Sequence, residues 1–431
     1  MSVQKVQTVD IYHGLPVYPD DVQGLTAIIT GANGISGHHM LRALGASPKR
    51  WSKIYCLSRR PPYTPGGLPA NAEHVAIDFL QSPEEIAAVL REKKVRADYV
   101  FFFAYLQPAP KSGAEGALWS DAAEMERVNM ALLTNFVGAM RVAGIKPRRF
   151  MHQTGAKNYG IHLGPTKLPQ EESNPRVGAD LEPNFYYSQE DFLSRYCREE
   201  GVGWNILMPA GILGAVPDAA MNLSFPLAVY AAVCAELKQP LLFPSDIASW
   251  QSYLSQSSAM MNAYMEEWAV LTPGAENQRF NVCDDSAFTW EGFWPHLAGW
   301  YGLEWRGPAD GAEYKETYTP HSPRGYGPKG PIRTTFTFVE WAKRPDVREA
   351  WARLAERHGL SQRELRDVDR VFGFLDGSIS RAGTLIFSMV KARKLGWHGT
   401  VDTTESLKAV FGDFVNIKMI PPMPKVNASS T

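Results

Sequence analysis

The sequence contains few cysteines and no long apolar segment. Its four cysteines, Cys56, Cys197, Cys234 and Cys283, are widely spaced among 431 residues and form no CxxC pair. This spacing predicts buried free thiols in a reducing compartment rather than disulfides or metal ligands. No run of 18 or more apolar residues occurs, and the first 24 residues lack the apolar core of a signal peptide. We therefore expect no membrane span, no metal site and a cytoplasmic location.

The chain also lacks an excess of charge of either sign. It has 44 lysines and arginines against 45 aspartates and glutamates, which gives a formal net charge of -1. Proteins that bind nucleic acid or anionic membranes carry a basic surface, so neither kind of partner is expected. With 45% hydrophobic and 21% charged residues, the composition is that of a globular protein with a sizeable core.

Apolar segments that alternate with amphipathic helical patterns predict an α/β fold. The six segments with the length and composition of strands lie within residues 25–30, 53–60, 72–79, 98–106, 148–155 and 203–214. Such continuous apolar runs are typical of parallel strands that helices cover on both faces. The pattern predicts a Rossmann-like, doubly wound parallel sheet followed by a mostly helical C-terminal substrate lobe.

We divide the chain into three parts on this basis. Residues 1–24 are expected to form an irregular N-terminal arm, residues 25–215 the dinucleotide-binding Rossmann domain, and residues 216–431 the substrate-binding lobe. One strand near residues 278–283 is expected to return to the Rossmann sheet. Residues 306–334 are rich in glycine, proline and tyrosine and are expected to form a long loop or lid.

A glycine-rich turn follows the first apolar strand and opens a helix. Gly31, Gly34 and Gly37 form a GxxGxxG pattern. The first glycine suits a tight turn, the second a close approach to a pyrophosphate, and the third close packing of helix and strand. The helix N-terminus then offers N–H donors and a positive dipole end to the phosphates. We expect Asn33 and Ile35 within this turn to contact the cofactor as well.

The end of the second strand predicts which dinucleotide binds. Ser58, Arg59 and Arg60 stand there, and the next acidic residue is Asp78. A hydroxyl and two guanidiniums suit the 2′-phosphate of NADP, which a carboxylate would repel. Asp78, after the third strand, is expected to contact the adenine. The alternatives are two solvated arginines before a turn and a helix N-cap at Asp78.

The tyrosine-lysine pair of standard short-chain reductases is missing. No tyrosine in the chain has a lysine four residues later; Tyr186 and Tyr187 are followed at that spacing by Glu190 and Asp191. Lys157 lies 29 residues before Tyr186, after the fifth strand, at the sheet edge where ligands bind. An ammonium beside a phenol would lower the pKa of the phenol from about 10. A solvated surface lysine is the alternative for Lys157.

Several segments resemble the PRISE group, the progesterone 5β-reductase and iridoid synthase-like members of the short-chain dehydrogenase/reductase superfamily, which are of an atypical extended type. The resemblance runs from about Leu25 to Pro422 and is most specific in PNFYYSQEDFL. Other matching segments are HQTGAKNYG, GWNILMPAGILGAVPDAAMNLSFPLAVYAAVCAEL, LLFPSDIASW and RKLGWHGTVDTTESL.

The resemblance implies a catalytic pair and a reaction. The lysine of the QTGxK segment is Lys157, and the first tyrosine of the NFYY pair is Tyr186. Tyr187 is assigned to packing, with a role as the functional phenol as the alternative. Glu190 and Asp191 are assigned to favourable charge near the helix N-terminus. Family members reduce an activated C=C bond with NADPH, and the phenol stabilises or protonates the enolate oxygen. Further expected cofactor contacts are Thr154, Lys157, Tyr186, Pro209, Gly211 and Ile212.

Some positions depart from the plant members of the group. Asn158 replaces a histidine, and Met208 replaces an arginine. Two residues within Gly160 to Leu163 are inserted, and FFFAYLQPAPKSG replaces the usual tryptophan-alanine block. The cofactor machinery is therefore expected to be intact, while the substrate-facing surface has changed.

The sequence leads to one main functional hypothesis and two alternatives. The main one is an NADPH-dependent reductase of a bulky apolar enone or enal in secondary metabolism. The alternatives are a carbonyl reductase or epimerase of the extended short-chain type, and a non-reductive NADP-binding cyclase or sensor. A homodimer could form through the helical segments 188–197 and 226–237.

Overall fold

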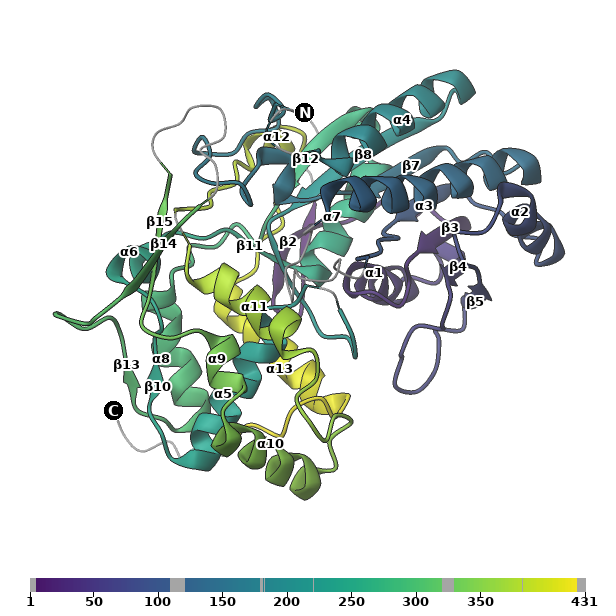
Figure 1. Cartoon of the computed structure of the whole chain (residues 1–431). Coiled ribbons are helices and arrows are strands. Elements are labelled where there is room, and N and C mark those ends of the chain that lie inside the picture. Colours follow the sequence, from purple (N-terminus) through teal and green to yellow (C-terminus); the bar gives the residue numbers. More distant parts are fainter. Residues whose placement is uncertain are drawn as a thin grey trace.

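The computed structural model describes residues 5–108, 121–178, 181, 183–219, 221–319, 329–381 and 383–424. Its centre is a seven-stranded parallel sheet, which confirms the predicted Rossmann-like fold (Figure 1). In sheet order, the strands are β12 (Gln278–Val282), β8 (Gly203–Pro209), β7 (Arg149–Gln153), β6 (Tyr99–Phe102), β3 (Leu25–Thr30), β4 (Trp51–Ser58) and β5 (Ala72–Ala76). The strand expected near residues 278–283 is β12, which pairs with β8 at one edge.

Helices cover both faces of this sheet, as its apolar strands require. Helices α2 (Pro83–Glu92), α3 (Ala122–Ala143) and α4 (Phe185–Glu200) pack side by side on one face. Helices α1 (Ile35–Gly45) and α7 (Ala259–Leu271) pack together on the other. All four residues of β6 are buried, as expected for a strand that helices cover on both sides.

The sheet changes winding direction between β3 and β6. From β3 the chain proceeds outward through β4 and β5, whereas β6, β7 and β8 extend the other way. Ligands of doubly wound sheets bind outside the carboxyl ends of the strands at such a point. The Thr30 hydroxyl accepts hydrogen bonds from the N–H groups of Phe103 and Ala104, at 3.0 and 3.2 Å, and so joins the ends of β3 and β6.

The second half of the chain is mostly helical. Besides α7, its α-helices in the described ranges are α5 (Ser224–Leu237), α6 (Ile247–Gln251), α8 (Trp290–Tyr301), α9 (Phe338–Ala342), α10 (Pro345–His358), α11 (Val368–Ile379), α12 (Val390–Lys394) and α13 (Thr403–Asn416). Trp290, Trp294 and Trp351 are fully buried among them. The abundant aromatic residues of this half therefore serve mainly as core packing.

Helix α5 is the core of this half and not an exposed apolar face. Every residue from Ser224 to Cys234 is buried. The expectation that segment 226–237 could form a dimer interface is therefore wrong, because α10, α11, α13 and α8 already pack against this helix. Helix α4 keeps an exposed side that carries charged residues, and a homodimer remains a prediction.

The N-terminal segment is not an irregular arm as expected. Strands β1 (Val6–Val9) and β2 (Tyr12–Pro16) form an antiparallel hairpin. The hairpin is fixed by distant contacts: the Tyr12 ring packs on Tyr264 of α7, and His13 exchanges backbone hydrogen bonds with Thr400. Strands this short show too little alternation to be recognised in a sequence.

Residues 306–334 also contain more regular structure than the predicted loop. Strands β14 (Lys315–Tyr318) and β15 (Pro331–Thr334) form an antiparallel ribbon, in which Arg333 pairs with Glu316 across the strands. Both strands are largely exposed, so they lack the apolar alternation that marks a strand in sequence. The part of the predicted loop at residues 320–328 lies outside the described residues.

Shorter pairings connect the sheet to the lobe. Strand β9 (Gly211–Leu213), which the sequence joined to β8, is separate and pairs with β11 (Gln256–Ser258), and β10 (Leu241–Leu242) pairs with β13 (Trp305–Arg306). All four cysteines are buried and free, as predicted. Within the described ranges, no helix is both long and apolar enough to span a bilayer.

Candidate active site

One large cavity of about 1290 Å³ lies at the carboxyl ends of the strands where the sheet changes direction. Residues after β3, β4, β6, β7 and β8 line it from the sheet side, and residues of α11 and segment 383–385 line it from the lobe. All fifteen residues expected from the sequence to contact cofactor or substrate border this cavity. They are Gly31, Asn33, Gly34, Ile35, Gly37, Ser58, Arg59, Arg60, Asp78, Thr154, Lys157, Tyr186, Pro209, Gly211 and Ile212.

The glycine-rich turn has the geometry that its spacing predicts. Gly31 has a φ of +63°, and its carbonyl accepts a hydrogen bond from Gly34 N–H at 2.9 Å. A Cβ at Gly37 would lie 2.5 Å from the Gly31 carbonyl oxygen, so helix α1 can approach the strand only with glycine there. Gly34 is the N-cap of α1 and no side chain caps the helix. The first N–H groups of α1 thus lack a side-chain acceptor at the cavity.

The residues after β4 present two cations to the cavity. The Ser58 hydroxyl is buried and donates to the Arg60 carbonyl at 2.7 Å, so it shapes the turn and does not stand free for a phosphate. Arg59 and Arg60 are exposed, and among the described residues neither side chain forms an ion pair or hydrogen bond. Asp78 lines the cavity and accepts from Leu80 N–H. It does not cap α2, because Ser82 does.

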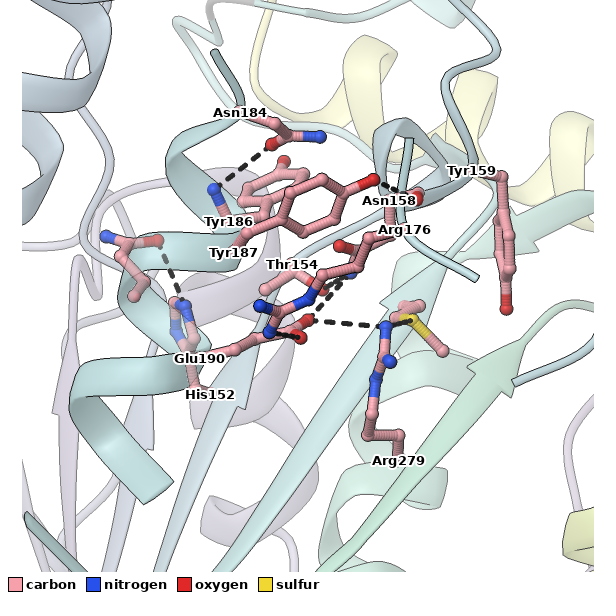
Figure 2. A network of polar contacts seen from close by, with 12 residues as sticks. His152, Thr154, Asn158, Tyr159, Arg176, Asn184, Tyr186, Tyr187, Glu190 and Arg279 are labelled. Carbon is pink, nitrogen blue, oxygen red and sulfur yellow. Dashed lines mark hydrogen bonds and ion pairs between the residues drawn. The ribbon is translucent and has the colours of Figure 1, made fainter. Parts of the chain in front are cut away.

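Lys157 and Tyr186 come to the same cavity from different elements. Lys157 is buried in the short 3₁₀ helix η1 (Ala156–Tyr159) that follows β7. Tyr186 lies in the first turn of α4, and its N–H donates to the Asn184 side chain at 3.1 Å (Figure 2). The Asn184 amide in turn donates to the Lys157 carbonyl at 3.0 Å, so one side chain connects the two segments. A Cβ at Gly155 would lie 3.5 Å from the Tyr186 hydroxyl, which places the phenol over that glycine.

The expected lowering of the Tyr186 pKa is wrong for the structure. Burial raises the pKa of this phenol above its ordinary value. The cause is the cost of removing a phenolate from water, which disfavours the charged form. Tyr186 therefore remains protonated at neutral pH and can act as a hydrogen-bond donor toward the cavity.

A buried carboxylate organises the segment behind this pair. Glu190 is 5% exposed by its side chain, accepts from the Asn158 amide at 2.9 Å, and pairs with Arg176 at 3.1 Å and Arg279 at 3.6 Å (Figure 2). Glu190 lies in the second turn of α4, so its role is this network and not the expected charge near the helix N-terminus. Asp191 is exposed and pairs with the same Arg176.

Hydrogen bonds from this network hold the 3₁₀ helix that carries Lys157. Asn158 donates to the Thr154 hydroxyl at 2.8 Å, and the Tyr187 hydroxyl donates to the Asn158 carbonyl at 2.6 Å. Tyr187 also accepts from Val177 N–H at 3.0 Å. Figure 2 shows the Tyr187 ring beside Tyr186, with its hydroxyl directed to Asn158. Tyr187 thus fixes the loop, in agreement with its assignment to packing.

The positions that depart from the plant pattern are part of the same region. Asn158 links Thr154 to Glu190. Ile161 and His162 of the inserted loop line the cavity. The Met208 sulfur contacts the Arg279 guanidinium at 3.4 Å, so a neighbouring strand supplies an arginine beside the position where the plant members have theirs. Within FFFAYLQPAPKSG, the residues from 109 onward lie outside the described part of the chain.

The sequence did not identify most of the lobe side of the cavity. Gly373, Phe374 and Gly377 of α11 line it, together with Arg381. On the sheet side it missed the buried His152, whose ring bonds the Gln189 side chain at 3.1 Å. The small-residue spacing in α11 is the one local signal that could have indicated a helix beside a ligand.

A family model described as a PRISE-like Rossmann-fold domain matches residues 27–326. The chain belongs to this family. The resemblance noted in the sequence is thereby confirmed.

Two relatives from plants cover almost the whole chain. An (S)-8-oxocitronellyl enol synthase of Camptotheca acuminata is 29% identical, over 94% of this chain and 95% of the relative. A 3-oxo-Δ4,5-steroid 5β-reductase of Arabidopsis thaliana is 28% identical, over 92% of this chain and 93% of the relative. Among solved structures, the UDP-glucuronic acid 4-epimerase of Bacillus cereus, in complex with UDP-glucuronic acid and NAD, aligns with a TM-score of 0.56. The alignment covers 91% of this chain and 99% of the epimerase at 13% identity, and it shows a shared fold.

We predict that Gly37→Ala will impair both folding and dinucleotide binding. The new methyl group would meet backbone atoms of Gly31 and Ala32, which cannot rotate away. Stability should fall by about 1–3 kcal/mol, the usual cost of overpacking. Urea unfolding and titration with NADPH measure the two effects. As a control, Gly412→Ala in α13 meets no atom within 4 Å and should be neutral or stabilising. Equal behaviour of the two variants would contradict this interpretation of the turn.

We also predict that Glu190→Gln will be far more harmful than Asp191→Asn. The first change leaves Arg176 and Arg279 without their buried carboxylate and should cost about 1–3 kcal/mol, because both arginines are only partly exposed. The second removes a contact of an exposed side chain and should cost less than about 1 kcal/mol. Urea midpoints compare the two, and similar losses would show that Glu190 does not organise the site.

Proposed function

We propose that the protein is an NADPH-dependent reductase of an activated C=C bond in an α,β-unsaturated ketone or aldehyde. The observation that carries the proposal is the meeting of Lys157, Tyr186 and the glycine-rich turn in one cavity, although no tyrosine has a lysine four residues later. Family membership and the named activities of the two plant relatives support it.

The residues present fit a nicotinamide dinucleotide. A pyrophosphate can approach the turn at Gly31 to Gly37, where side chains would collide with backbone, and can accept from the uncapped N–H groups of α1. Arg59 and Arg60 offer guanidiniums to a 2′-phosphate, and no carboxylate follows β4 directly to repel it. These features favour NADPH over NADH.

We assign to Tyr186 the stabilisation of the negative charge that develops on the substrate. When bound, NADPH supplies the hydride that adds to the β-carbon of the substrate. The charge then builds on the carbonyl oxygen, and a protonated phenol fixed in a partly dry site stabilises it there. The raised pKa keeps Tyr186 protonated and able to donate over the neutral range. Lys157, held by the η1 helix, is assigned to the cofactor ribose and to the electrostatics around the phenol.

In carbonyl reduction, the hydride adds to the carbon that is bonded to the carbonyl oxygen. In conjugate addition, it adds to the β-carbon, which lies farther from that oxygen. In this chain the phenol lies in the first turn of α4, and the lysine is shifted to η1 after β7. We infer that this shift brings the β-carbon, and not the carbonyl carbon, toward the nicotinamide. The buried, free state of all four cysteines supports a reducing compartment such as the cytoplasm.

The direct test is NADPH oxidation with a panel of enones and enals, from cyclohexenone to steroids and open-chain terpenoid enals. Consumption of NADPH together with a product two hydrogens heavier across C=C is the expected result. NADPH binding without turnover on any member would contradict the reductase and favour a non-reductive role, and reduction of the carbonyl alone would favour the carbonyl reductase.

For the catalytic group, we predict that Tyr186→Phe will lower kcat/KM by roughly 10²–10⁴-fold, the range of a lost general acid or oxyanion donor. NADPH affinity should change by less than about twofold, because the ring remains and only the hydroxyl is lost. Steady-state kinetics and cofactor fluorescence separate the two quantities. A matched change, Tyr187→Phe, should act mainly through stability, since that hydroxyl bonds backbone groups. Parallel losses of turnover and NADPH affinity in Tyr186→Phe would overturn the assignment.

For cofactor choice, we predict that the double change Arg59→Gln and Arg60→Gln will weaken NADPH binding by roughly tenfold or more, since charge-assisted contacts are worth about 1.5–3 kcal/mol. NADH binding should be almost unchanged. Arg348→Gln, at another exposed arginine in α10, serves as the control for surface charge. An equal loss for both cofactors would place these arginines outside the 2′-phosphate site.

A further inference from the structure

Arg381 lines the cavity from the lobe side, in the segment that follows α11. Four residues after Arg381, Leu385 pairs with the segment that precedes β11: Ser255 N–H donates to the Leu385 carbonyl at 2.7 Å, and Leu385 N–H donates to the Tyr253 carbonyl at 3.1 Å. The carbonyl of Arg381 itself accepts a hydrogen bond from the Ser249 hydroxyl at 3.4 Å. This hydrogen bond anchors the backbone from which the Arg381 side chain extends.

The guanidinium of Arg381 has no protein partner among the residues that the structure describes. Its Nε is sealed from solvent without an acceptor, while the side chain as a whole is half-buried and borders the cavity. Neither an ion pair nor an aromatic ring accompanies it in the described ranges. Burial lowers the pKa of this guanidinium. Burying a charged group without a partner costs free energy, and proteins contain few such groups.

The carboxylates of the adjoining elements are already engaged elsewhere. Asp376 of α11 accepts from the N–H groups of Phe338 and Val339, at 2.6 and 3.2 Å. Asp369 pairs with Lys343 at 2.6 Å. Asp246, the N-cap of α6, accepts from Ser249 N–H and lies 3.7 Å from Arg333. None of these three carboxylates pairs with Arg381.

The other arginines of the cavity differ from Arg381 in their surroundings. Arg370 donates to the Ala219 carbonyl at 2.7 Å and pairs with Asp367 and Asp218. Arg59 and Arg60 are exposed and lie after β4, at the dinucleotide end. Arg381 is enclosed, belongs to the lobe, and follows the helix that lines the substrate side.

Apolar groups form part of the cavity wall on the side of Arg381. Phe374 with Gly373 and Gly377 contributes from α11, and Leu254 and Leu385 contribute from the segments beside β11. A ligand that fills this side needs an apolar body to cover these groups. At one end it needs an anion to satisfy the guanidinium.

We propose that Arg381 binds a carboxylate of the substrate, so that the substrate class is an apolar enone or enal that carries an acid group. The planar guanidinium can donate two parallel hydrogen bonds to a carboxylate, a geometry that a ketone or hydroxyl cannot match. The inference rests on the proposed reductase function for the position of the reacting carbonyl. It goes beyond that function because nothing in conjugate reduction requires an acidic substrate.

The test uses matched pairs of enone carboxylic acids and their methyl esters, from a carboxymethyl cyclohexenone to 3-oxoandrost-4-ene-17β-carboxylic acid. The wild-type protein should reduce the acid of at least one pair with a kcat/KM roughly tenfold or more above its ester, mainly through KM. Arg381→Met should lose the preference for the acid and keep turnover of the ester, and Arg381→Lys should retain part of it. NADPH affinity of both variants should equal that of the wild type.

Three results would overturn the inference. The wild type could treat acids and esters alike, the preference could survive in Arg381→Met, or Arg381→Met could weaken NADPH binding, which would assign the residue to the cofactor. If no pair is reduced, the proposed function fails. The carboxylate site is then tested separately, by measuring whether the acids bind to the NADPH complex. Thermal stabilisation of the NADPH complex by an acid but not its ester, lost in Arg381→Met, would support the carboxylate site. No acid-specific stabilisation of the wild type would overturn it.

Discussion

The contact of α1 with the end of β3 is the constraint on which the site depends. A Cβ at position 37 would lie 2.5 Å from the Gly31 carbonyl oxygen, so only glycine fits there. Helix and strand therefore meet backbone to backbone. This contact directs the α1 N-terminus toward the gap between β3 and β6, whose ends the Thr30 hydroxyl joins. Because the sheet changes direction at this gap, no crossover helix covers it, and the cavity opens there.

The second constraint is the ion network behind Lys157 and Tyr186. In standard short-chain reductases, one helix carries both the tyrosine and the lysine. Here Lys157 comes from a short 3₁₀ helix after β7, which by itself is too short to be rigid. Asn158 and Tyr187 attach that segment to α4, and Glu190 holds Asn158 in turn. Lys157 can therefore keep a fixed position outside the tyrosine helix. The buried Glu190 carboxylate provides, through Asn158, the rigidity that a shared helix provides in standard short-chain reductases.

The sequence predicted the parts of the molecule that depend on local pattern. Continuous apolar runs indicated the parallel strands, and the glycine spacing indicated the turn at Gly31. The hairpin at β1 and β2 was missed because its stability comes from Tyr264 and Thr400, which are hundreds of residues away. The apolar composition of α5 indicated burial, but not whether a second copy or the rest of the chain buries it.

The same difference between local sequence pattern and long-range contacts applies to the site. Tyr186 and Lys157 were identified because their motifs resemble a family, whereas the direction of the Tyr186 pKa depends on how deeply α4 packs, which no motif records. Glu190 was assigned to the helix dipole because its partners, Arg176 and Arg279, lie far away in sequence. Arg381 gave no signal at all, since an arginine becomes informative only when its surroundings show that no carboxylate is available.

The near-neutral chain therefore encloses a cavity whose available charges are mainly positive. Asp369 and Asp218 on its wall pair with lysine or arginine, whereas Arg59, Arg60 and Arg381 have no acidic partner among the described residues. Such a field attracts anions into a region of low dielectric. The exposed pair after β4 suits the more hydrated phosphate of a dinucleotide. The enclosed Arg381 suits an anion that arrives attached to an apolar body, so charge and burial together separate the cofactor end from the substrate end.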